Sequence, residues 1–359
     1  MSYAYVFGPV VSSRLGRSLG LDLLGRRVCS MDCLYCEVGA THVHTMERSA
    51  VVSSATVLDE LERWAAENTI ALDHVTLGGS GEPCLNTELG AIIAGCRRIL
   101  PGVPVAVLTN TTLLHLPEVC EQLMQADVVL PSLDSLVERE FRAINRPVSG
   151  VTAQAVAQAL LAFRRVYTGR IYLEVLLLEG VNDSEENLAL LRAFVRQLHP
   201  DRVDVTTLSR PGTWARALPV GRDVLDRWTG LLAASLPATV DVASRALQEA
   251  ATPTPGCVCD CATRQGKAPA DTQTPLDFSH DAKVRESLVA SLRRRPQTTS
   301  QLALALGLPM HVVETALAAL HAEHVAAHVA DHAATTGAGA AATPDAEPFW
   351  TLTGPASGA

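Results

Sequence analysis

Short apolar runs alternate with longer amphipathic stretches between Ala55 and Leu236, and this alternation constrains the fold more than any other feature. The short runs are rich in β-branched residues, as strands are, whereas the longer stretches repeat apolar residues every three or four positions, as helices do. Strands are predicted at His74–Leu77, Val103–Leu108, Asp127–Leu130, Ile171–Leu178 and Val203–Thr207, and the segment entering Val28 is a candidate for a first one.

The amphipathic stretches between these runs are predicted to be helices. They cover Ala55–Glu67, Thr87–Ile99, Leu116–Met124, Ala153–Val166 and Ser184–Leu198. About six successive βα units favour an α/β fold with a parallel sheet, either open and doubly wound or curled into a partial barrel. Periodicity alone does not separate these two folds.

Polar clusters follow three of the predicted strands. The sequence GGSGEP comes directly after Leu77, and Asn110 follows the next strand along the chain. Ser132 and Asp134 follow the third. In parallel α/β folds, ligands bind at the carboxyl ends of the strands. The sequence therefore predicts that these residues share one pocket.

The segment VCSMDCLYCEVG places Cys29, Cys33 and Cys36 close together in the chain. Three residues separate the first pair and two separate the second, so one loop can wrap three thiolates around a single iron–sulfur cluster. The fourth iron is then free to be chelated by a ligand with an amine and a carboxylate. Two other interpretations are a zinc site, which normally needs a fourth protein ligand, and three buried thiols that pack as small hydrophobes.

This spacing, with the aromatic Tyr35 directly before the third cysteine, resembles the signature of the radical S-adenosylmethionine superfamily. The turn GGSGEP is similar to that family's glycine-glycine-glutamate motif through Gly81 and Glu82, whereas Ser80 stands where the first motif glycine would fall. The resemblance implies a partial (β/α)6 TIM-like barrel, a [4Fe-4S] cluster on the three cysteines and S-adenosylmethionine at the open iron. A flexible turn is the alternative interpretation of GGSGEP.

Asn110, Ser132 and Asp134 lie in segments that resemble the strand ends which hold the cofactor's ribose and carboxylate in this superfamily. Turn or helix-cap roles are the alternative, since these residue types are common there. Arg14 and Arg17 suit either an anionic group near the cluster or salt bridges at the barrel's open edge. The sequence does not decide between the two.

A closer resemblance covers roughly residues 5–215, through FGPVVSSRLGRSLG, SGEPCLN, PSLDS, FRAINRP, LEVLLLEGVND and TTLSRPG. These segments resemble a bacterial and archaeal subgroup of iron–sulfur oxidoreductases associated by similarity with wyosine-type transfer RNA synthesis. The resemblance implies an enzyme that is reduced by a donor such as flavodoxin or ferredoxin and abstracts hydrogen from its substrate. A transfer RNA base or another nucleotide is the first candidate substrate and a peptide or protein the second, because one fold can host different reactions.

The length of 359 residues favours two domains. A net charge of −9 argues against binding nucleic acid through bulk charge. The first residues lack the features of a secretory signal, and no apolar stretch nears the roughly 18 residues of a transmembrane helix, so a cytoplasmic protein without a membrane segment is expected. Six of the nine cysteines fall in two tight groups, which favours metal ligation over disulfides.

Composition changes near Ala250, where TPTPGCVCDCATRQGKAPADTQTP has no helical or strand period. Cys257, Cys259 and Cys261 alternate in this stretch. Their density indicates a second iron–sulfur cluster or another metal, with redox-active thiols as the rival interpretation. The predicted division is a radical S-adenosylmethionine barrel over residues 1–248, a Cys/Pro-rich linker or metal-binding loop over 249–280 and a third region over 281–359.

The third region is predicted to form three helices followed by two strands, an order typical of a winged-helix-like module. The helices are Asp281–Arg294, Thr299–Leu306 and Pro309–His321, and the strands are Val325–Val329 and Phe349–Leu352. Residues 281–330 hold five Lys/Arg and four Asp/Glu, so the strong basic footprint of a nucleic-acid reader is missing. Presenting a partner is one interpretation, and the competing function is a redox-sensing regulator that binds DNA and uses the cluster as a sensor.

Overall fold

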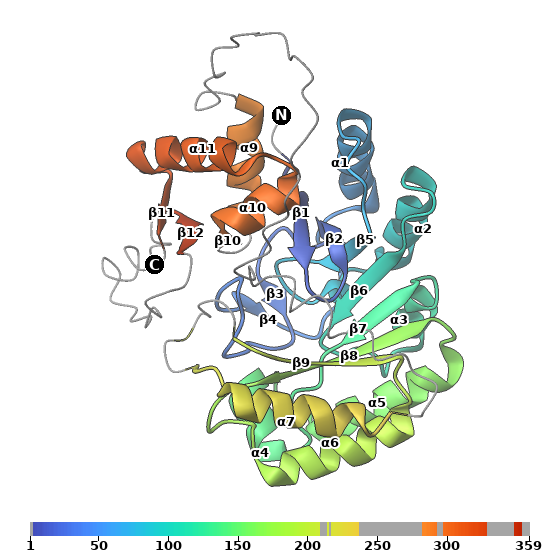
Figure 1. The fold of residues 1–359 in the computed structure, drawn as a ribbon. Coiled ribbons are helices and arrows are strands. Elements are labelled where there is room, and N and C mark those ends of the chain that lie inside the picture. Colours follow the sequence, from blue (N-terminus) through green and yellow to red (C-terminus); the bar gives the residue numbers. More distant parts are fainter. Residues whose placement is uncertain are drawn as a thin grey trace, which may run out of the picture.

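The main sheet has seven strands in a computed structural model that describes residues 3–208, 214, 217–236, 282–292, 297–328 and 348–353 (Figure 1). The strand order is β1-β2-β5-β6-β7-β8-β9. Strand β1 is antiparallel to β2, and every later pair is parallel. The strands are β1 (Val6–Ser12), β2 (Gly16–Asp22), β5 (His74–Gly78), β6 (Val105–Thr109), β7 (Val128–Pro131), β8 (Arg170–Leu177) and β9 (Arg202–Thr207).

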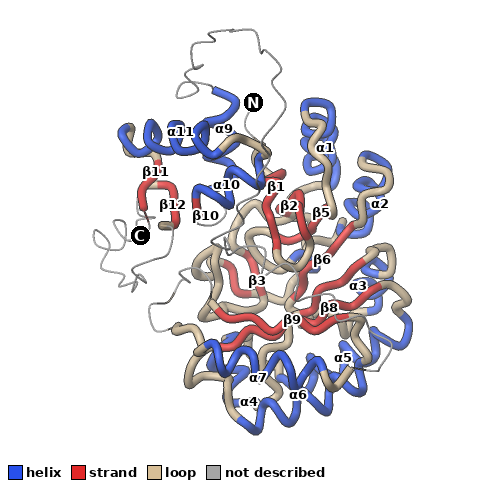
Figure 2. The backbone as a smooth tube through the Cα atoms, in the orientation of Figure 1, coloured by secondary structure: helices blue, strands red, loops and turns tan. Residues whose placement is uncertain are grey.

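Helices cover the outer face of this curved sheet (Figure 2). They are α1 (Ser54–Glu67), the short 3₁₀ helix η1 (Pro83–Leu85), α2 (Leu89–Ile99), α3 (Pro117–Leu123), α4 (Glu138–Asn145), α5 (Ala153–Val166), α6 (Glu185–Leu198) and α7 (Arg222–Ala233). Ser53, Thr152 and Ser184 cap α1, α5 and α6 by accepting a bond from a backbone N–H of the first turn. The apolar faces of helices and strands form one large core. Six parallel strands with these helices fit the predicted partial barrel.

The prediction for the first strand was wrong. Val28–Cys29 forms only the two-residue strand β3, which pairs with β4 (Val43–His44) outside the main sheet. The first parallel strand is β2, whose sequence GRSLGLD lacks a continuous apolar run because a serine and a glycine alternate with its two leucines. Helix α4 was also missed, since the apolar period in EREFRAIN rests on Phe141 and Ile144 alone.

The turn between β1 and β2 closes the floor of the barrel at the amino ends of the strands. Leu15 of this turn is 4% exposed and packs against Ala106, Val128 and Leu130. The carbonyl oxygen of Leu15 also lies 2.8 Å from Nδ1 of His74 at the start of β5. An apolar plug therefore seals one end of the barrel, and the other end is left for a ligand.

The C-terminal region lies beside β1 and has a separate core (Figure 1). It contains α9 (Ala282–Leu292), β10 (Gln297–Thr298), α10 (Thr299–Leu306), α11 (Met310–Ala322), β11 (Ala326–His328) and β12 (Phe349–Leu352). These include the three predicted helices and two predicted strands. The strands form an antiparallel sheet in the order β10-β12-β11, and α9 and α10 contact β1. Residues 249–280, with Cys257, Cys259 and Cys261, lie outside the described residues, and the winged-helix-like assignment stays a prediction.

Within the part of the chain that the structure describes, no single helix is long and apolar enough to cross a membrane. Helices α10 and α11 meet the length and composition criteria only as a pair, with a bend of 120° between them. Their apolar residues Leu302, Val313 and Leu317 are buried in the core of the C-terminal region.

Candidate active site

The cysteine loop, residues 29–36, lies across the carboxyl ends of the strands and is fixed to the end of α4. The N–H of Asp32 donates to the Asn145 carbonyl (3.1 Å), and the N–H of Leu34 donates to the Ile144 carbonyl (2.8 Å). All three cysteines of the loop line one cavity of about 300 Å³. Residues that follow β5, β6 and β7 line the same cavity, as the sequence predicts for a shared pocket.

N–H groups donate to each of the three cysteine sulfurs. The donors are the N–H of Met31 and Nδ2 of Asn110 for Cys29 (both 3.4 Å), Nδ2 of Asn145 for Cys33 (3.6 Å), and the backbone N–H groups of Val38 and Gly39 for Cys36. Burial raises the pKa of Cys29 to about 12 and the pKa of Cys33 well above its usual range. These thiols therefore ionise only where a positive charge, such as that of bound iron, compensates for burial.

The three thiols of the cysteine loop are close neighbours. All three line one cavity, and both Cys29 and Cys36 contribute to the raised pKa of Cys33. Among the residues with described positions, no group of three His, Cys, Asp or Glu side chains is arranged to hold a single metal ion. A cluster that takes one thiolate at each of three irons stays a prediction from the cysteine spacing.

The GGSGEP turn packs directly against the chain that leads into the cysteine loop. Gly79 has a φ of +103°, and a Cβ on Gly81 would lie 1.8 Å from the carbonyl oxygen of Val28. Only glycine fits at either position without strain or a clash. The hydroxyl of Ser80 donates to the buried carboxylate of Asp22 (2.6 Å) at the end of β2. Packing within the protein thus explains both the glycines and the serine that departs from the family motif.

Glu82 is buried, with 2% of its surface exposed, and it lines the cavity. Its Oε1 accepts bonds from the N–H of Cys84 (3.0 Å) and the hydroxyl of Thr109 (2.9 Å), and its Oε2 accepts one from the N–H of Asn110 (2.7 Å). Burial raises the pKa of Glu82, and these bonds oppose that shift. The carboxylate fastens the GGSGEP turn to the end of β6, while its contact with a ligand's ammonium stays a prediction.

Asn110 connects the end of β6 to the cysteine loop. Its Nδ2 donates to the hydroxyl of Ser30 (2.9 Å) and to the sulfur of Cys29, and its Oδ1 accepts a bond from the hydroxyl of Thr112 (2.7 Å). The next residue, Thr111, has a φ of +68°, a left-handed conformation that β-branched residues rarely adopt. The strained turn aims the Asn110 amide at the cysteine loop.

Ser132 and Asp134 lie two residues apart after β7 but have different surroundings. Ser132 is half-buried and lines the cavity. Asp134 is buried behind the cysteine loop, where its carboxylate accepts bonds from the hydroxyl of Tyr35 (2.6 Å), the amide of Asn145 (2.6 Å) and the N–H of Leu176 (2.9 Å). Burial raises the pKa of Asp134 to about 6. The structure therefore gives Asp134 bonds that hold the loop, α4 and β8 together, while Tyr35 lines the cavity.

A family model described as the radical SAM superfamily matches residues 26–191, the segment that contains the cysteine loop, the GGSGEP turn and these strand ends. A UPF0026 protein of Helicobacter pylori is 36% identical over 58% of this chain and 68% of its own length. The chain belongs to the UPF0026 family, within the radical SAM superfamily. Members of this superfamily are enzymes that cleave S-adenosylmethionine with a [4Fe-4S] cluster, and in this chain the three cysteines of the loop line one cavity. The wyosine-like subgroup stays a hypothesis.

Two further proteins are similar to parts of this UPF0026 chain. A protein of Brachyspira hyodysenteriae named GTPase Obg is 34% identical over 67% of this chain, which spans 35% of that protein's length. A solved radical SAM methyltransferase from Sphaerobacter thermophilus has a TM-score of 0.45 and 18% identity, over 62% of this chain and 65% of that one.

In this UPF0026 protein an ion pair joins the barrel floor to the cavity. Arg14, from the turn that closes the floor, pairs with Glu174 of β8, and both residues line the cavity. The negative charge of Glu174 is the first cause of the raised pKa of Arg14. Of the two roles open for Arg14, the structure shows a salt bridge. Sequence reasoning missed Glu174, although a lone carboxylate in the strand IYLEVLLL is the signal for it.

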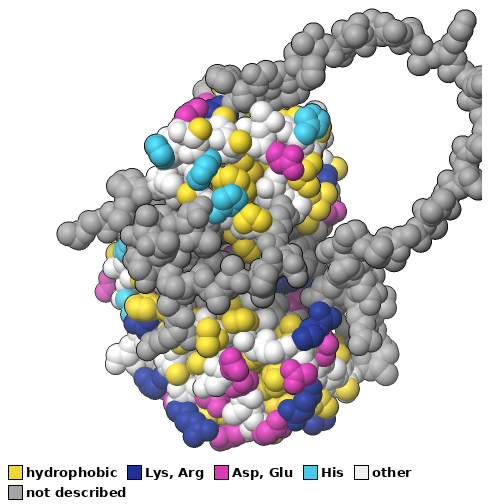
Figure 3. Space-filling view, turned by 60° about the vertical axis from the view of Figure 1, so that its left-hand side comes forward, with side chains coloured by type: hydrophobic (Ala, Val, Ile, Leu, Met, Phe, Trp, Pro, Cys, Tyr) yellow, Lys and Arg dark blue, Asp and Glu magenta, His cyan; other side chains and the backbone are white. Residues whose placement is uncertain are grey.

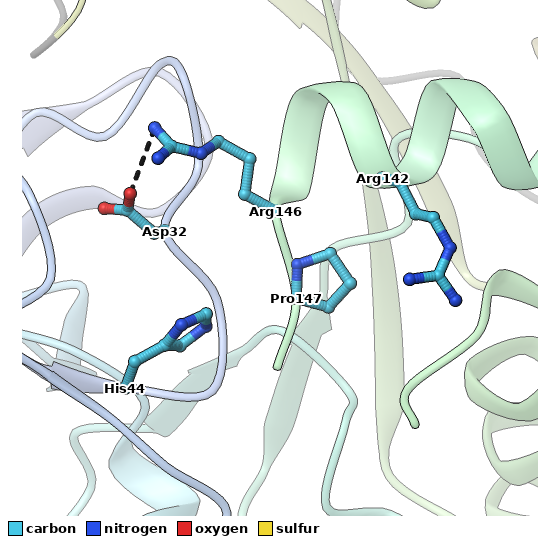
Figure 4. Close-up of a pocket in the computed structure, with 5 residues that line it drawn as sticks. All are labelled: Asp32, His44, Arg142, Arg146 and Pro147. Atoms are coloured by element: carbon cyan, nitrogen blue, oxygen red, sulfur yellow. Dashed lines mark ion pairs between the residues drawn. The ribbon is translucent and has the colours of Figure 1, made fainter. Parts of the chain in front are cut away.

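A second depression of about 280 Å³ lies on the outer side of the cysteine loop (Figure 4). Five residues line it: Asp32, His44, Arg142, Arg146 and Pro147. The guanidinium of Arg146 forms an ion pair with Asp32 (3.0 Å) and lies over the ring of Trp214, 4.5 Å from its centroid. Arg142 pairs with Glu138 of its own helix (2.7 Å) and is half exposed. Sequence reasoning did not single out these residues, since chain segments that are far apart form the depression.

Proposed function

We propose that this protein cleaves S-adenosylmethionine reductively with a cluster held by Cys29, Cys33 and Cys36, and that its substrate is an RNA base or another nucleotide. The supporting observation is that the cysteine loop, the GGSGEP turn and the ends of β6 and β7 all line one cavity. When bound, cluster and cofactor supply a 5′-deoxyadenosyl radical that abstracts hydrogen from the substrate. The chain itself must position the ligands and exclude water.

Two polar side chains are proposed to contact S-adenosylmethionine. Ser132 lines the cavity with a hydroxyl that has no hydrogen-bond partner among the described residues. Asn110 lines the same wall, where its amide already fixes the loop around Cys29. A free hydroxyl can bond a ribose or carboxylate oxygen without breaking a bond inside the protein. Ser132 is therefore the stronger candidate for a direct contact.

The floor of the barrel suits a reaction that must be kept from water. Leu15, Ala106, Val128 and Leu130 form a buried apolar cluster beneath the cavity. This cluster closes the part of the floor around Leu15 to solvent, beside the Arg14–Glu174 ion pair. Exclusion of water protects a reactive species in the cavity from side reactions. The ligands are expected to enter at the carboxyl ends of the strands.

The Arg14–Glu174 pair supports a substrate with both hydrogen-bond donors and acceptors. Guanidinium and carboxylate lie side by side on the cavity wall, with the apolar side chains of Leu108 and Leu176 also lining it. A nucleobase offers a flat apolar face and an edge with donors and acceptors, which matches this combination. A peptide stays the second candidate, because its amides offer the same groups without the flat face.

The C-terminal region is proposed to be a winged-helix-like module that presents the substrate or a partner. Its helix α11 has the sequence MHVVETALAALHA, which contains neither Lys nor Arg. On the face shown in Figure 3, Lys and Arg side chains lie mostly over the barrel and are mixed with Asp and Glu. A DNA-reading module normally has a concentrated basic face, whereas residues 281–330 hold five Lys/Arg against four Asp/Glu, so the charge balance of the sequence favours the enzyme over the regulator.

The test is anaerobic reconstitution with iron and sulfide, followed by addition of dithionite and S-adenosylmethionine and measurement of 5′-deoxyadenosine. We expect the product to form in the parent and in Cys120→Ala, whose thiol lies in α3 away from the cavity and donates to the Leu114 carbonyl (3.2 Å). A reconstituted parent that binds a specific DNA and never forms 5′-deoxyadenosine would instead assign the protein to the regulator class.

A further inference from the structure

Asn145, the last residue of α4, gives Cys33 a hydrogen bond that a substitution can remove. Its Nδ2 lies 3.6 Å from the sulfur of Cys33. Within the described part of the chain, this amide is the only N–H group that donates to that sulfur. Cys29 and Cys36, by contrast, receive bonds from backbone N–H groups, which a side-chain substitution leaves in place. The hydrogen bonding of one of the three thiols therefore depends on a single side chain.

The orientation of the Asn145 amide is set by Asp134. A carboxylate only accepts hydrogen bonds, so the Asp134 oxygen that lies 2.6 Å from Nδ2 faces one hydrogen of the NH₂ group. The second hydrogen of that group is then available for the sulfur of Cys33. Asp134 is itself held by the hydroxyl of Tyr35 (2.6 Å) and the N–H of Leu176 (2.9 Å). A chain of bonds that begins at β8 thus fixes the amide against Cys33.

The oxygen of the Asn145 side chain does not take part in this chain of bonds. Asn145 is 3% exposed, and its Oδ1 has no hydrogen-bond partner among the described residues. Buried polar groups that serve the fold alone are usually paired. Asn187 is an example, because its buried amide accepts a bond from the N–H of Leu136 (2.9 Å) and donates to two backbone carbonyls (3.0 and 2.8 Å). The contrast indicates that Asn145 is placed for its N–H bonds, one of which goes to Cys33.

Hydrogen bonds to the sulfurs of an iron–sulfur cluster help to set its reduction potential. A reduced cluster carries one more negative charge than an oxidised one, so an N–H donor at a thiolate stabilises the reduced form more. The thiol hydrogen of Cys33, which faces the Asn145 carbonyl oxygen (3.7 Å), is lost when the sulfur binds iron. The sulfur then only accepts, and the Asn145 amide is the donor beside it.

We infer that Asn145 is a positioning residue that raises the reduction potential of the cluster through its bond to Cys33, with Asp134 holding its amide in place. The inference rests on the proposed function and adds a residue that controls how readily the site takes up an electron. In the step concerned, a reductant loses one electron and the cluster gains it, while no bond forms or breaks. Asn145 does not line the cavity, so it acts through Cys33 and not on a ligand.

The test compares the reconstituted full chain with Asn145→Leu and with a matched control, Asn187→Leu. Leucine is close to asparagine in shape but has no N–H donor, and the backbone bonds between α4 and the cysteine loop remain. Asn187 is also a buried asparagine bonded to Asp134, and its hydrogen bonds reach no cysteine in the described part of the chain. The midpoint potential is measured by titration with dithionite and electron paramagnetic resonance of the reduced cluster, beside iron content and thermal unfolding.

We expect Asn145→Leu to hold about threefold to tenfold less reduced cluster at the same applied potential, a midpoint lower by about 30–60 mV, since tenfold corresponds to about 59 mV for one electron. Asn187→Leu loses three hydrogen bonds, so it should unfold at a lower temperature than the parent, yet it should keep the parent's midpoint. Equal midpoints in the three proteins, or the same shift in both variants, would overturn the inference.

A second variant covers the case in which leucine prevents cluster assembly. Asn145→Ala removes the same donor without adding a branched apolar side chain, and its midpoint should also fall. If neither variant takes up iron while Asn187→Leu does, Asn145 serves assembly and not the potential, and the inference is wrong.

The two proposals fail in different ways. If the reconstituted parent forms no 5′-deoxyadenosine with dithionite and S-adenosylmethionine, the proposed function is wrong. If the parent forms it and the midpoint does not respond to Asn145→Leu, the function stands and the role of Asn145 is wrong.

Discussion

The two ends of the barrel are built from the same strands but have opposite chemistry. At the amino ends, Ala106 of β6 and Val128 of β7 pack around Leu15. Directly beyond the carboxyl ends of these strands, Asn110 and Ser132 line the cavity with polar groups. Because side chains alternate along a strand, residues at even spacing share the inner face from floor to rim. Each of these strands, together with the residues directly after it, thus contributes both to the apolar floor and to the polar wall of the cavity.

We call the amino ends of the strands the floor and their carboxyl ends the rim. Substitutions at the floor are expected to change stability, and substitutions at the rim are expected to change ligand binding. Floor residues make apolar contacts whose loss costs folding free energy, whereas rim residues make few contacts with the core and are free to meet a ligand. Glu82 lies between these extremes, since it is buried like a floor residue and lines the cavity like a rim residue. The substitutions below test whether the separation holds.

The largest expected effect is at the rim. Cys33→Ala should abolish cluster assembly and 5′-deoxyadenosine formation, because a thiolate ligand is lost from a loop. The melting temperature without iron should change little, since the loop stays bonded to the end of α4 through backbone groups. Iron content, product and thermal unfolding are measured beside Cys120→Ala. A Cys33→Ala protein that keeps its full iron content and activity would remove this cysteine from the site.

The next largest effect is expected at the floor, where a substitution should lower the free energy of unfolding. Leu15→Ala should lower the free energy of unfolding by about 2–4 kcal/mol, because it leaves a cavity in the buried plug. Cluster content and cofactor cleavage should remain near the parent values below the melting temperature. Leu304→Ala is the control, since Leu304 is 56% exposed and should cost little. Loss of cleavage without loss of stability in Leu15→Ala would show that floor and rim are coupled.

Sequence patterns located β5, β6, β7 and β8 because each carries apolar residues buried against the helices. Strand β9, which is half-buried throughout, was located from its β-branched residues in RVDVTT. They failed at β2, since burial there is shared with a hairpin partner and depends on glycines that admit close neighbours such as Phe7 against Gly20. The hydrophobic period within one segment carries no information about a partner strand elsewhere in the chain. The antiparallel edge strand and the apolar floor were therefore not predicted.

The candidate site was predictable where chemistry depends on spacing along the chain, as in the cysteine loop. The orientation of single side chains was not predictable. Asp134 and Ser132 are two residues apart, yet the first is buried among Tyr35, Asn145 and Leu176 while the second lines the cavity. The Arg14–Glu174 pair joins positions far apart in sequence, which no local motif encodes.

A smaller effect on stability is expected at Glu82, which is buried like a floor residue and lines the cavity like a rim residue. Glu82→Ala leaves the N–H groups of Cys84 and Asn110 and the hydroxyl of Thr109 without their acceptor, so it should cost about 1–3 kcal/mol of stability. Glu82→Gln keeps the shape and one acceptor oxygen, and should cost less. Iron content and S-adenosylmethionine affinity are measured for both. A fall in affinity with iron unchanged supports contact with the ligand's ammonium, whereas an equal fall in both assigns Glu82 to structure alone.

The smallest effect on stability is expected at Ser132, so its substitution isolates the contribution of a rim residue to ligand binding. Its hydroxyl has no protein partner among the described residues, so Ser132→Ala removes no internal bond and should leave the melting temperature and iron content unchanged. If the hydroxyl bonds the cofactor, the dissociation constant for S-adenosylmethionine should rise about threefold to tenfold, the usual value of one hydrogen bond. Equilibrium binding is compared with Ser149→Ala, an exposed serine outside the cavity. An unchanged dissociation constant would show that this part of the rim faces the substrate or solvent instead, and Asn110 would then be the remaining polar candidate on that wall.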